Sequence, residues 1–156
     1  MKTYSHRIAL ISPLLAVLFW GSAFAQARPA ASIPSAALIQ PAELATALTD
    51  ASAAKPLILQ VGFRKLYDQA HILGAQYAGP ARDAEGLRAL RQRVAKLPKA
   101  AAIVIYCGCC PWSHCPNIAP AYYALHALGF RNLKVLYIAD NFGTNWVDKG
   151  YPTTRS

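Results

Sequence analysis

The sequence predicts an α/β domain with a mostly parallel central sheet and helices on both of its faces. Two short runs, 57–61 and 101–106, are apolar at nearly every position. Strands that are apolar on both faces belong to parallel sheets covered by helices. Helical patterns lie between these runs, and such alternation is typical of an α/β fold. With 156 residues, 54% hydrophobic and 15% charged, the chain fits one compact domain and is not a disordered or fibrous protein.

The first elements are a helix and a buried strand. Pro41 is suited to the first turn of a helix, which we expect over 41–48. The strand over 57–61 follows, bounded by Pro56 and Gly62.

The clearest helix spans Asp83 to Leu97. Four apolar residues recur on one of its faces, namely Leu87, Leu90, Val94 and Leu97. The elements expected after it are, in order, a strand over 101–106, a helix over 118–128, a strand over 133–138 and a short helix over 140–149.

The first 25 residues have the three-part pattern of a secretory signal peptide. Lys2 and Arg7 form a basic head, and the apolar run 8–20 has 13 residues, fewer than the roughly 20 of a membrane-spanning helix. Ala23-Phe24-Ala25 offers a cleavage site. We therefore expect a signal peptide over 1–25 and export, to the periplasm. An uncleaved anchor is the alternative, and membrane contact is expected only through this segment.

After the signal segment, residues 26–37 are rich in Ala, Ser and Pro and are expected to form a flexible leader, so that the domain covers 38–156. Loss of Lys2 and Arg7 leaves 14 basic and 7 acidic side chains. An exported basic protein does not meet nucleic acid, and its field favours small anions or anionic membrane surfaces.

All four cysteines lie within nine residues, from Cys107 to Cys115. This segment directly follows an expected central strand and precedes a helix, where open α/β sheets place their ligand sites. Backbone N–H groups at a helix N-terminus favour a thiolate. We therefore expect Cys107 to be the most acidic and most nucleophilic of the four thiols. Asn117 is expected to cap the helix that follows.

Three motifs in the correct order resemble the rhodanese family, the sulfurtransferases and their inactive relatives. Residues 59–75 are similar to its first signature, and residues 127–130 and 146–152 to its C-terminal signature. Residues 103–107 match the strand that ends in the family's catalytic cysteine. The resemblance covers about 39–152 and implies a single rhodanese-like domain.

For chemistry, the resemblance implies that Cys107 attacks the outer sulfur of a small anionic donor such as thiosulfate. A persulfide forms on Cys107, and a thiol acceptor then takes the sulfur. No cofactor is implied. The persulfide is expected to be cradled by the amides of the loop formed by Gly108, Cys109, Cys110, Pro111, Trp112, Ser113 and His114.

The sequence departs from the family pattern at several positions. Gln60 stands where the family usually has Asp, Gly62 where it has Arg, and Ala70 where it has Gly. The cysteine loop is also longer than usual and lacks the arginine commonly found near its end. We therefore expect weak activity with thiosulfate itself and a different physiological donor.

Three other interpretations of the loop remain open. Cys107 and Cys110 have the spacing of a dithiol redox site. Thiolates and imidazole suit Cu(I) or Zn, and the candidate ligands are Cys109, Cys110, His114 and Cys115. A disulfide of Cys109 or Cys110 with Cys115 would instead fix the loop of a non-catalytic module. His114 is also a candidate base for Cys107.

Overall fold

The computed structural model describes residues 32–156, which form a five-stranded parallel sheet with the strand order β1-β6-β5-β2-β4. Each pair of neighbouring strands in this sheet is parallel. The strands are β1 (Leu38–Ile39), β2 (Leu57–Gln60), β4 (Gln76–Tyr77), β5 (Ile103–Tyr106) and β6 (Leu133–Leu136). The predicted α/β class with a mostly parallel central sheet is confirmed.

The register of β2 and β5 determines where the loops after these strands lie. Leu57 pairs with Ile103 and Gln60 with Tyr106, so the two strands end side by side. The residues that follow them, Gly62 and Cys107, therefore lie next to each other at the carboxyl edge of the sheet.

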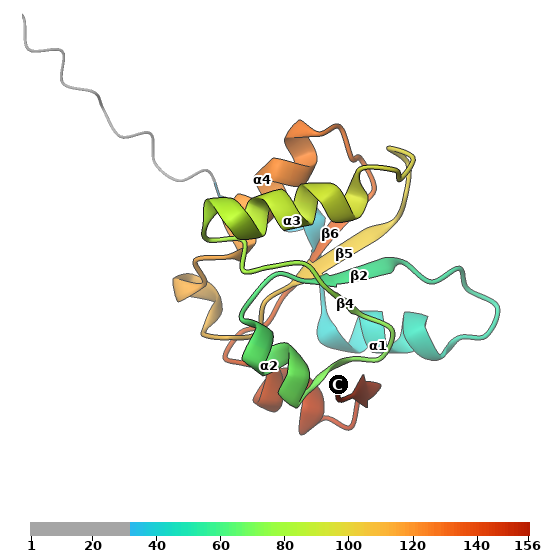
Figure 1. Cartoon of the computed structure of the whole chain (residues 1–156). Coiled ribbons are helices and arrows are strands. Elements are labelled where there is room, and N and C mark those ends of the chain that lie inside the picture. The colour runs from blue at the N-terminus through green and yellow to red at the C-terminus, as the bar shows by residue number, and fades with distance from the viewer. Residues whose placement is uncertain (1–31) are drawn as a thin grey trace, which may run out of the picture.

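Helices cover both faces of the sheet (Figure 1). On one face α3 (Ala84–Val94) and α4 (Ile118–Ala127) pack against every second strand residue, including Leu59, Ile105 and Val135. On the other face α1 (Pro41–Thr49) packs against the residues between them. A short helix, α2 (Arg64–Gln69), follows β2. Because the two faces use alternate residues, the strands are apolar throughout, as their sequence indicated.

The longest helix begins and ends close to where its sequence pattern predicted. Asp83 caps α3, and its carboxylate accepts a hydrogen bond from Gly86 N at 2.9 Å. Leu90 and Val94 are fully buried. The helix ends at Val94 rather than at Leu97, which lies in the following turn and still packs against the core.

The C-terminal segment folds back on the first signature. Strand β7 (Thr153–Thr154) pairs antiparallel with β3 (His71–Ile72). The helix expected over 140–149 is a single π-helical turn, Gly143–Val147. Within it Trp146 is fully buried, and its Nε1 donates to Pro152 O at 3.1 Å. His71 is buried, bonds to Tyr67 O through Nδ1 and stacks on the Tyr67 ring, which makes it a structural residue.

Residues 32–37, expected to belong to the flexible leader, contact the domain instead. Residues Ser35–Ala37 form a 3-10 helix, and Ala37 is buried. Lys134 Nζ donates to Ala36 O at 2.7 Å. The domain therefore begins before Leu38. The expected signal peptide lies outside the described residues, and within 32–156 no helix is long and apolar enough to cross a membrane.

A candidate active site of clustered cysteines

Cys107 follows β5 directly and is only 3% exposed. The chain turns sharply at the next residue, Gly108, which has a φ of 72°. A Cβ on Gly108 would lie 2.6 Å from Phe142 Cβ, so both the backbone conformation and the packing require glycine here. Phe142 N donates to Gly108 O at 3.1 Å and holds this turn in place. The turn brings the loop back over the sulfur of Cys107.

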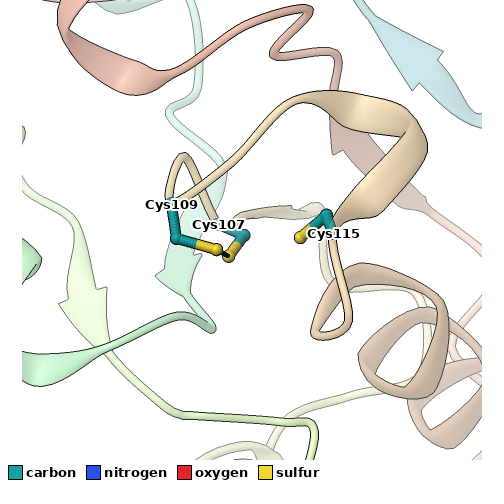
Figure 2. Close-up of side chains that lie close together, drawn as sticks. All are labelled: Cys107, Cys109 and Cys115. Atoms are coloured by element: carbon teal, nitrogen blue, oxygen red, sulfur yellow. Dashed lines mark hydrogen bonds between the residues drawn. The ribbon is translucent and has the colours of Figure 1, made fainter.

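Three sulfur atoms gather at this turn. The Sγ atoms of Cys107, Cys109 and Cys115 all lie within 4.8 Å of one another. Figure 2 shows the three side chains pointing toward a common centre from different parts of the loop. Cys107 Sγ and Cys109 Sγ are 3.1 Å apart. We call these three residues the sulfur cluster; all four cysteines of the loop are free thiols.

Cys110 and His114 lie outside the sulfur cluster. Cys110 Sγ is 2.9 Å from Cys109 Sγ but turns toward the loop backbone, where it contacts His114 O at 3.6 Å. His114 is exposed, and its Nδ1 bonds to Ser113 Oγ at 2.8 Å. The ligand set expected from sequence, Cys109, Cys110, His114 and Cys115, is therefore not assembled. Cys107 takes part instead, and His114 is not positioned as its base.

Asn117 is a site residue rather than a helix cap. Its side chain makes no cap hydrogen bond to α4. Its Nδ2 donates to Cys107 Sγ at 3.3 Å, and its Oδ1 accepts from Arg82 N at 3.0 Å. Asn117 is fully buried. A buried amide that is satisfied in this way fixes the position of a donor against the sulfur.

Two residues at the end of β2, Gln60 and Gly62, lie against Cys107. Gln60 is buried, donates through Nε2 to Cys107 O at 3.3 Å and accepts from Gly62 N at 3.2 Å. A Cβ on Gly62 would lie 2.9 Å from Cys107 Sγ. Two of the departures from the family pattern, Gln60 and Gly62, therefore lie in direct contact with the start of the cysteine loop.

The amides at the start of α4 converge on Cys115, not on Cys107. The Cys107 thiol, and the backbone N–H groups of Asn117 and Ile118, donate to Cys115 and lower the pKa of its thiol to about 6. The hydrogen bond to Cys115, followed by burial, raises the pKa of Cys107. Within this pair, the directions of the two pKa shifts favour the thiolate of Cys115 over that of Cys107. The expectation that Cys107 is the most acidic thiol is not met, because the loop places Cys115 at the helix N-terminus.

The pKa of Cys110 is raised rather than lowered, in contrast to that of Cys115. Burial, together with the hydrogen bond to Cys109, raises the pKa of Cys110 to about 12.

Two backbone N–H groups of the loop bond to backbone carbonyls and not to Cys107. Trp112 N donates to Ala139 O, and His114 N donates to Pro111 O. These two amides cannot contribute to the cradle expected around Cys107. The N–H of Cys109 does reach the Cys107 sulfur and favours its thiolate.

The sulfur cluster separates two cavities. One cavity, of about 270 Å³, is lined by Cys107 and Cys109 together with Gln60, Gln69, Tyr106, Asn141 and Phe142, and none of its described lining residues carries a charge. The other, of about 370 Å³, is lined by Cys115 with Ser32, Ile33, Trp112 and Ile118. Trp112 is packed against Tyr137, with ring centroids 5.0 Å apart, and forms one wall of this second cavity. Cys107 therefore lines the first cavity and Cys115 the second.

No protein-family model matches the chain, and no curated protein matches it. Solved structures do. The rhodanese-like domain of the Alr3790 protein from Anabaena sp aligns at 23% identity and a TM-score of 0.57, covering 77% of this chain and 80% of that one. The chain has a rhodanese-like fold.

Two further structures agree with this assignment. A crystal structure of the Alr3790 protein aligns with a TM-score of 0.58 at 23% identity, over 76% of this chain and 82% of that one. The BH2092 protein from Bacillus halodurans aligns with a TM-score of 0.57 at 19% identity, over 76% of each chain. The rhodanese-like fold expected from the three sequence motifs is confirmed, with Cys107 at the carboxyl end of the central strand β5.

Sequence reasoning missed two parts of this candidate site. It assigned Asn117 to capping, because residues of this type before a helix usually cap it. It also left Cys115 outside the preferred nucleophile set. The Cys115-Pro116-Asn117 segment directly before the expected helix offered a signal for Cys115, since a cysteine there lies next to the helix N-terminal amides.

Proposed function

We propose that the protein is a sulfurtransferase in which Cys107 carries sulfane sulfur. The observation that carries the proposal is the environment of Cys107. Cys107 follows the central strand β5 and lines a cavity. Its sulfur accepts hydrogen bonds from Asn117 Nδ2 and from the backbone N–H of Cys109. Fixed donors of this kind stabilise negative sulfur both before and after transfer.

The proposed reaction begins with a proton shift within the Cys107 and Cys115 pair. Cys115 takes the proton, which leaves the thiolate on Cys107. This thiolate attacks the outer sulfur of a persulfide donor, the donor's S–S bond breaks, and the donor leaves as a thiolate. A Cys107 persulfide remains. An acceptor thiolate then attacks its outer sulfur and restores the Cys107 thiolate, so no external oxidant or reductant is needed.

The cavity beside Cys107 favours donors of low charge. Its polar lining comes from neutral side chains, including Gln60, Gln69 and Asn141. A dianion such as thiosulfate would lose hydration there without gaining an ionic partner. We therefore propose an organic persulfide or polysulfide as donor and a small thiol as acceptor, with thiosulfate as a slow substrate.

A second candidate function is thiol–disulfide exchange, favoured by the closeness of the Cys107 and Cys115 sulfur atoms, which lie within 4.8 Å of each other. Here the Cys115 thiolate attacks a substrate disulfide, and Cys107 resolves the mixed disulfide. The substrate is reduced by two electrons and the protein gains a Cys107–Cys115 disulfide. The reacting pair would be Cys107 and Cys115 rather than the Cys107 and Cys110 expected from spacing.

Intact mass measurements separate the two candidates. Reduced, metal-free protein is incubated with a small organic persulfide and compared with its Cys107→Ser, Cys115→Ser and Cys110→Ser variants. Sulfur transfer predicts a gain of one sulfur atom that Cys107→Ser abolishes, that Cys115→Ser and Cys110→Ser retain and that cyanide removes. Thiol–disulfide exchange predicts loss of two hydrogens on treatment with a disulfide, abolished by either Cys107→Ser or Cys115→Ser. The absence of any Cys107-dependent sulfur adduct would refute the sulfurtransferase.

We also propose export to the periplasm, from the basic head and apolar run at the start of the sequence. Protein isolated from its host should begin at Gln26, or at Arg28 if the second small-residue site is used. An intact chain in the membrane fraction would refute signal removal.

A further inference from the structure

The sulfur cluster has a second property that does not depend on sulfur transfer. It gathers three ligand atoms of one chemical kind, the Sγ atoms of Cys107, Cys109 and Cys115, within 4.8 Å of one another. From their positions in the loop and their common direction in Figure 2, we propose that these three cysteines form a trigonal binding site for Cu(I).

The distances suit an ion at the centre of the cluster. Around a trigonal ion with metal–sulfur bonds of about 2.3 Å, the sulfur atoms lie about 4 Å apart. The Cys107 and Cys109 sulfurs are 3.1 Å apart, and no pair of the three is more than 4.8 Å apart. An ion would need the Cys107 and Cys109 sulfurs to move apart, and Cys109 lies on the partly exposed loop, whereas Cys107 is buried.

Donors around the cluster are suited to metal-bound thiolates. Asn117 Nδ2 lies 3.3 Å from Cys107 Sγ and 3.9 Å from Cys109 Sγ. The backbone N–H of Cys109 points at Cys107, and those of Asn117 and Ile118 point at Cys115. Each ligand sulfur therefore has at least one N–H donor, and such outer contacts orient ligands and stabilise their charge.

The donor set selects the metal. It contains only soft thiolate sulfur, which favours Cu(I), Zn and iron–sulfur centres. Structural zinc sites are almost always four-coordinate, and among residues 32–156 no histidine or carboxylate joins the three sulfurs. A three-sulfur set without a fourth ligand is suited to Cu(I). Binding releases the thiol protons to solvent and involves no electron transfer when copper is supplied as Cu(I).

The site shares Cys107 with the proposed sulfurtransferase, so copper binding and persulfide formation exclude each other. The two proposals remain independent in their tests, because copper binding needs no sulfur donor. Cys110 provides a matched control, since it belongs to the same loop but lies outside the cluster.

The test uses the full chain, reduced, metal-free and without oxygen. Cu(I) is titrated in competition with a chromophoric Cu(I) chelator, and X-ray absorption is recorded on the product. We expect one ion bound by three sulfur atoms. Cys109→Ser and Cys115→Ser should weaken binding by more than the roughly 10–100-fold that loss of an outer-shell partner costs. Cys110→Ser removes only a contact to the ligand Cys109 and should cost no more than that, and His114→Ala should leave affinity unchanged.

A second measurement works on the unmodified chain and needs no variant to fold. Bound Cu(I) should protect Cys107, Cys109 and Cys115 from iodoacetamide while Cys110 stays reactive at high pH. Transfer of all copper to the chelator at equimolar competition would overturn the proposal. So would preferential binding of Zn(II) with a nitrogen ligand, or an equal loss of affinity in Cys110→Ser.

Discussion

Gly62 lies so close to Cys107 that a Cβ at position 62 would be 2.9 Å from the Cys107 sulfur. The same Cβ would be 3.0 Å from Gln60 Nε2 and 3.2 Å from Cys107 O. No larger side chain fits while the sulfur keeps its place. An arginine, which the rhodanese family usually has at this position, is therefore excluded here by the place of the Cys107 sulfur.

We expect Gly62→Ala to displace the Cys107 sulfur and slow its sulfur loading at least tenfold, measured by intact mass against time. Gly74→Ala is the matched control. Gly74 has a φ of 81°, and a Cβ there meets nothing within 4 Å. This control should lower thermal stability through backbone strain but leave loading unchanged. Equal loading rates in Gly62→Ala and the unmodified protein would contradict the contact.

Asn117→Asp should slow the reaction of Cys107 while retaining the fold. The remaining carboxylate still accepts from Arg82 N, but a negative charge replaces the N–H donor beside the sulfur. Like charges raise a thiol pKa, and each unit lowers the thiolate fraction tenfold. The loading rate should fall about tenfold or more, and its pH profile should shift to higher pH.

The exposed Asn132→Asp variant introduces the same charge on the surface and serves as the control. If Asn117→Asp lowers the loading rate at every pH but its pH profile does not shift, Asn117 has a purely structural role.

Cys115 should be the first thiol to react as the pH is raised from 4. Its pKa is lowered to about 6, below the usual value for cysteine, so its thiolate forms above that pH and is lost below it. Limiting iodoacetamide followed by peptide mapping should show half-maximal labelling of Cys115 near pH 6. Cys110, whose pKa is raised to about 12, should stay unlabelled through neutral pH. Earlier labelling of Cys107 would show that the charge rests on Cys107.

A cation placed at the mouth of the cavity should improve the use of thiosulfate. Val147 lines the cavity beside Cys107 and is 38% exposed, so a longer side chain can be accommodated. Val147→Arg should lower KM for thiosulfate severalfold, while Val147→Gln should not, because only the guanidinium pairs with the anion. Steady-state cyanide assays with each donor would measure this. Equal KM values for the two variants would show that charge at the cavity is not the limiting factor.

The sheet could be predicted from sequence because its evidence is local. Two strands with apolar residues on both faces, such as 103–106, and a helix with one apolar face, Ala84–Val94, indicate a covered parallel sheet without knowledge of long-range contacts. The position of Cys107 at the end of a central strand follows from the same pattern.

The inside of the site could not be predicted in the same way, because distant residues shape it. Trp112 N bonds to Ala139 O, and Asn117 bonds to Arg82, which is 35 positions away. These contacts decide that the helix amides point at Cys115 and that Asn117 turns toward sulfur. Four cysteines within nine residues indicate thiol chemistry, but not which thiol carries the charge.

The placement of Cys107 and Cys115 in separate cavities bears on kinetic order. A covalent intermediate that one substrate forms and a second consumes gives ping-pong kinetics when both substrates use one cavity in turn. Here a molecule in the cavity of Gln60 and Asn141 does not fill the one beside Ile33 and Trp112. Because both half-reactions of the proposed sulfur transfer occur at Cys107, donor and acceptor must use the first cavity in turn, so parallel initial-rate plots are expected, and intersecting plots would indicate that the acceptor binds in the second cavity, beside Cys115.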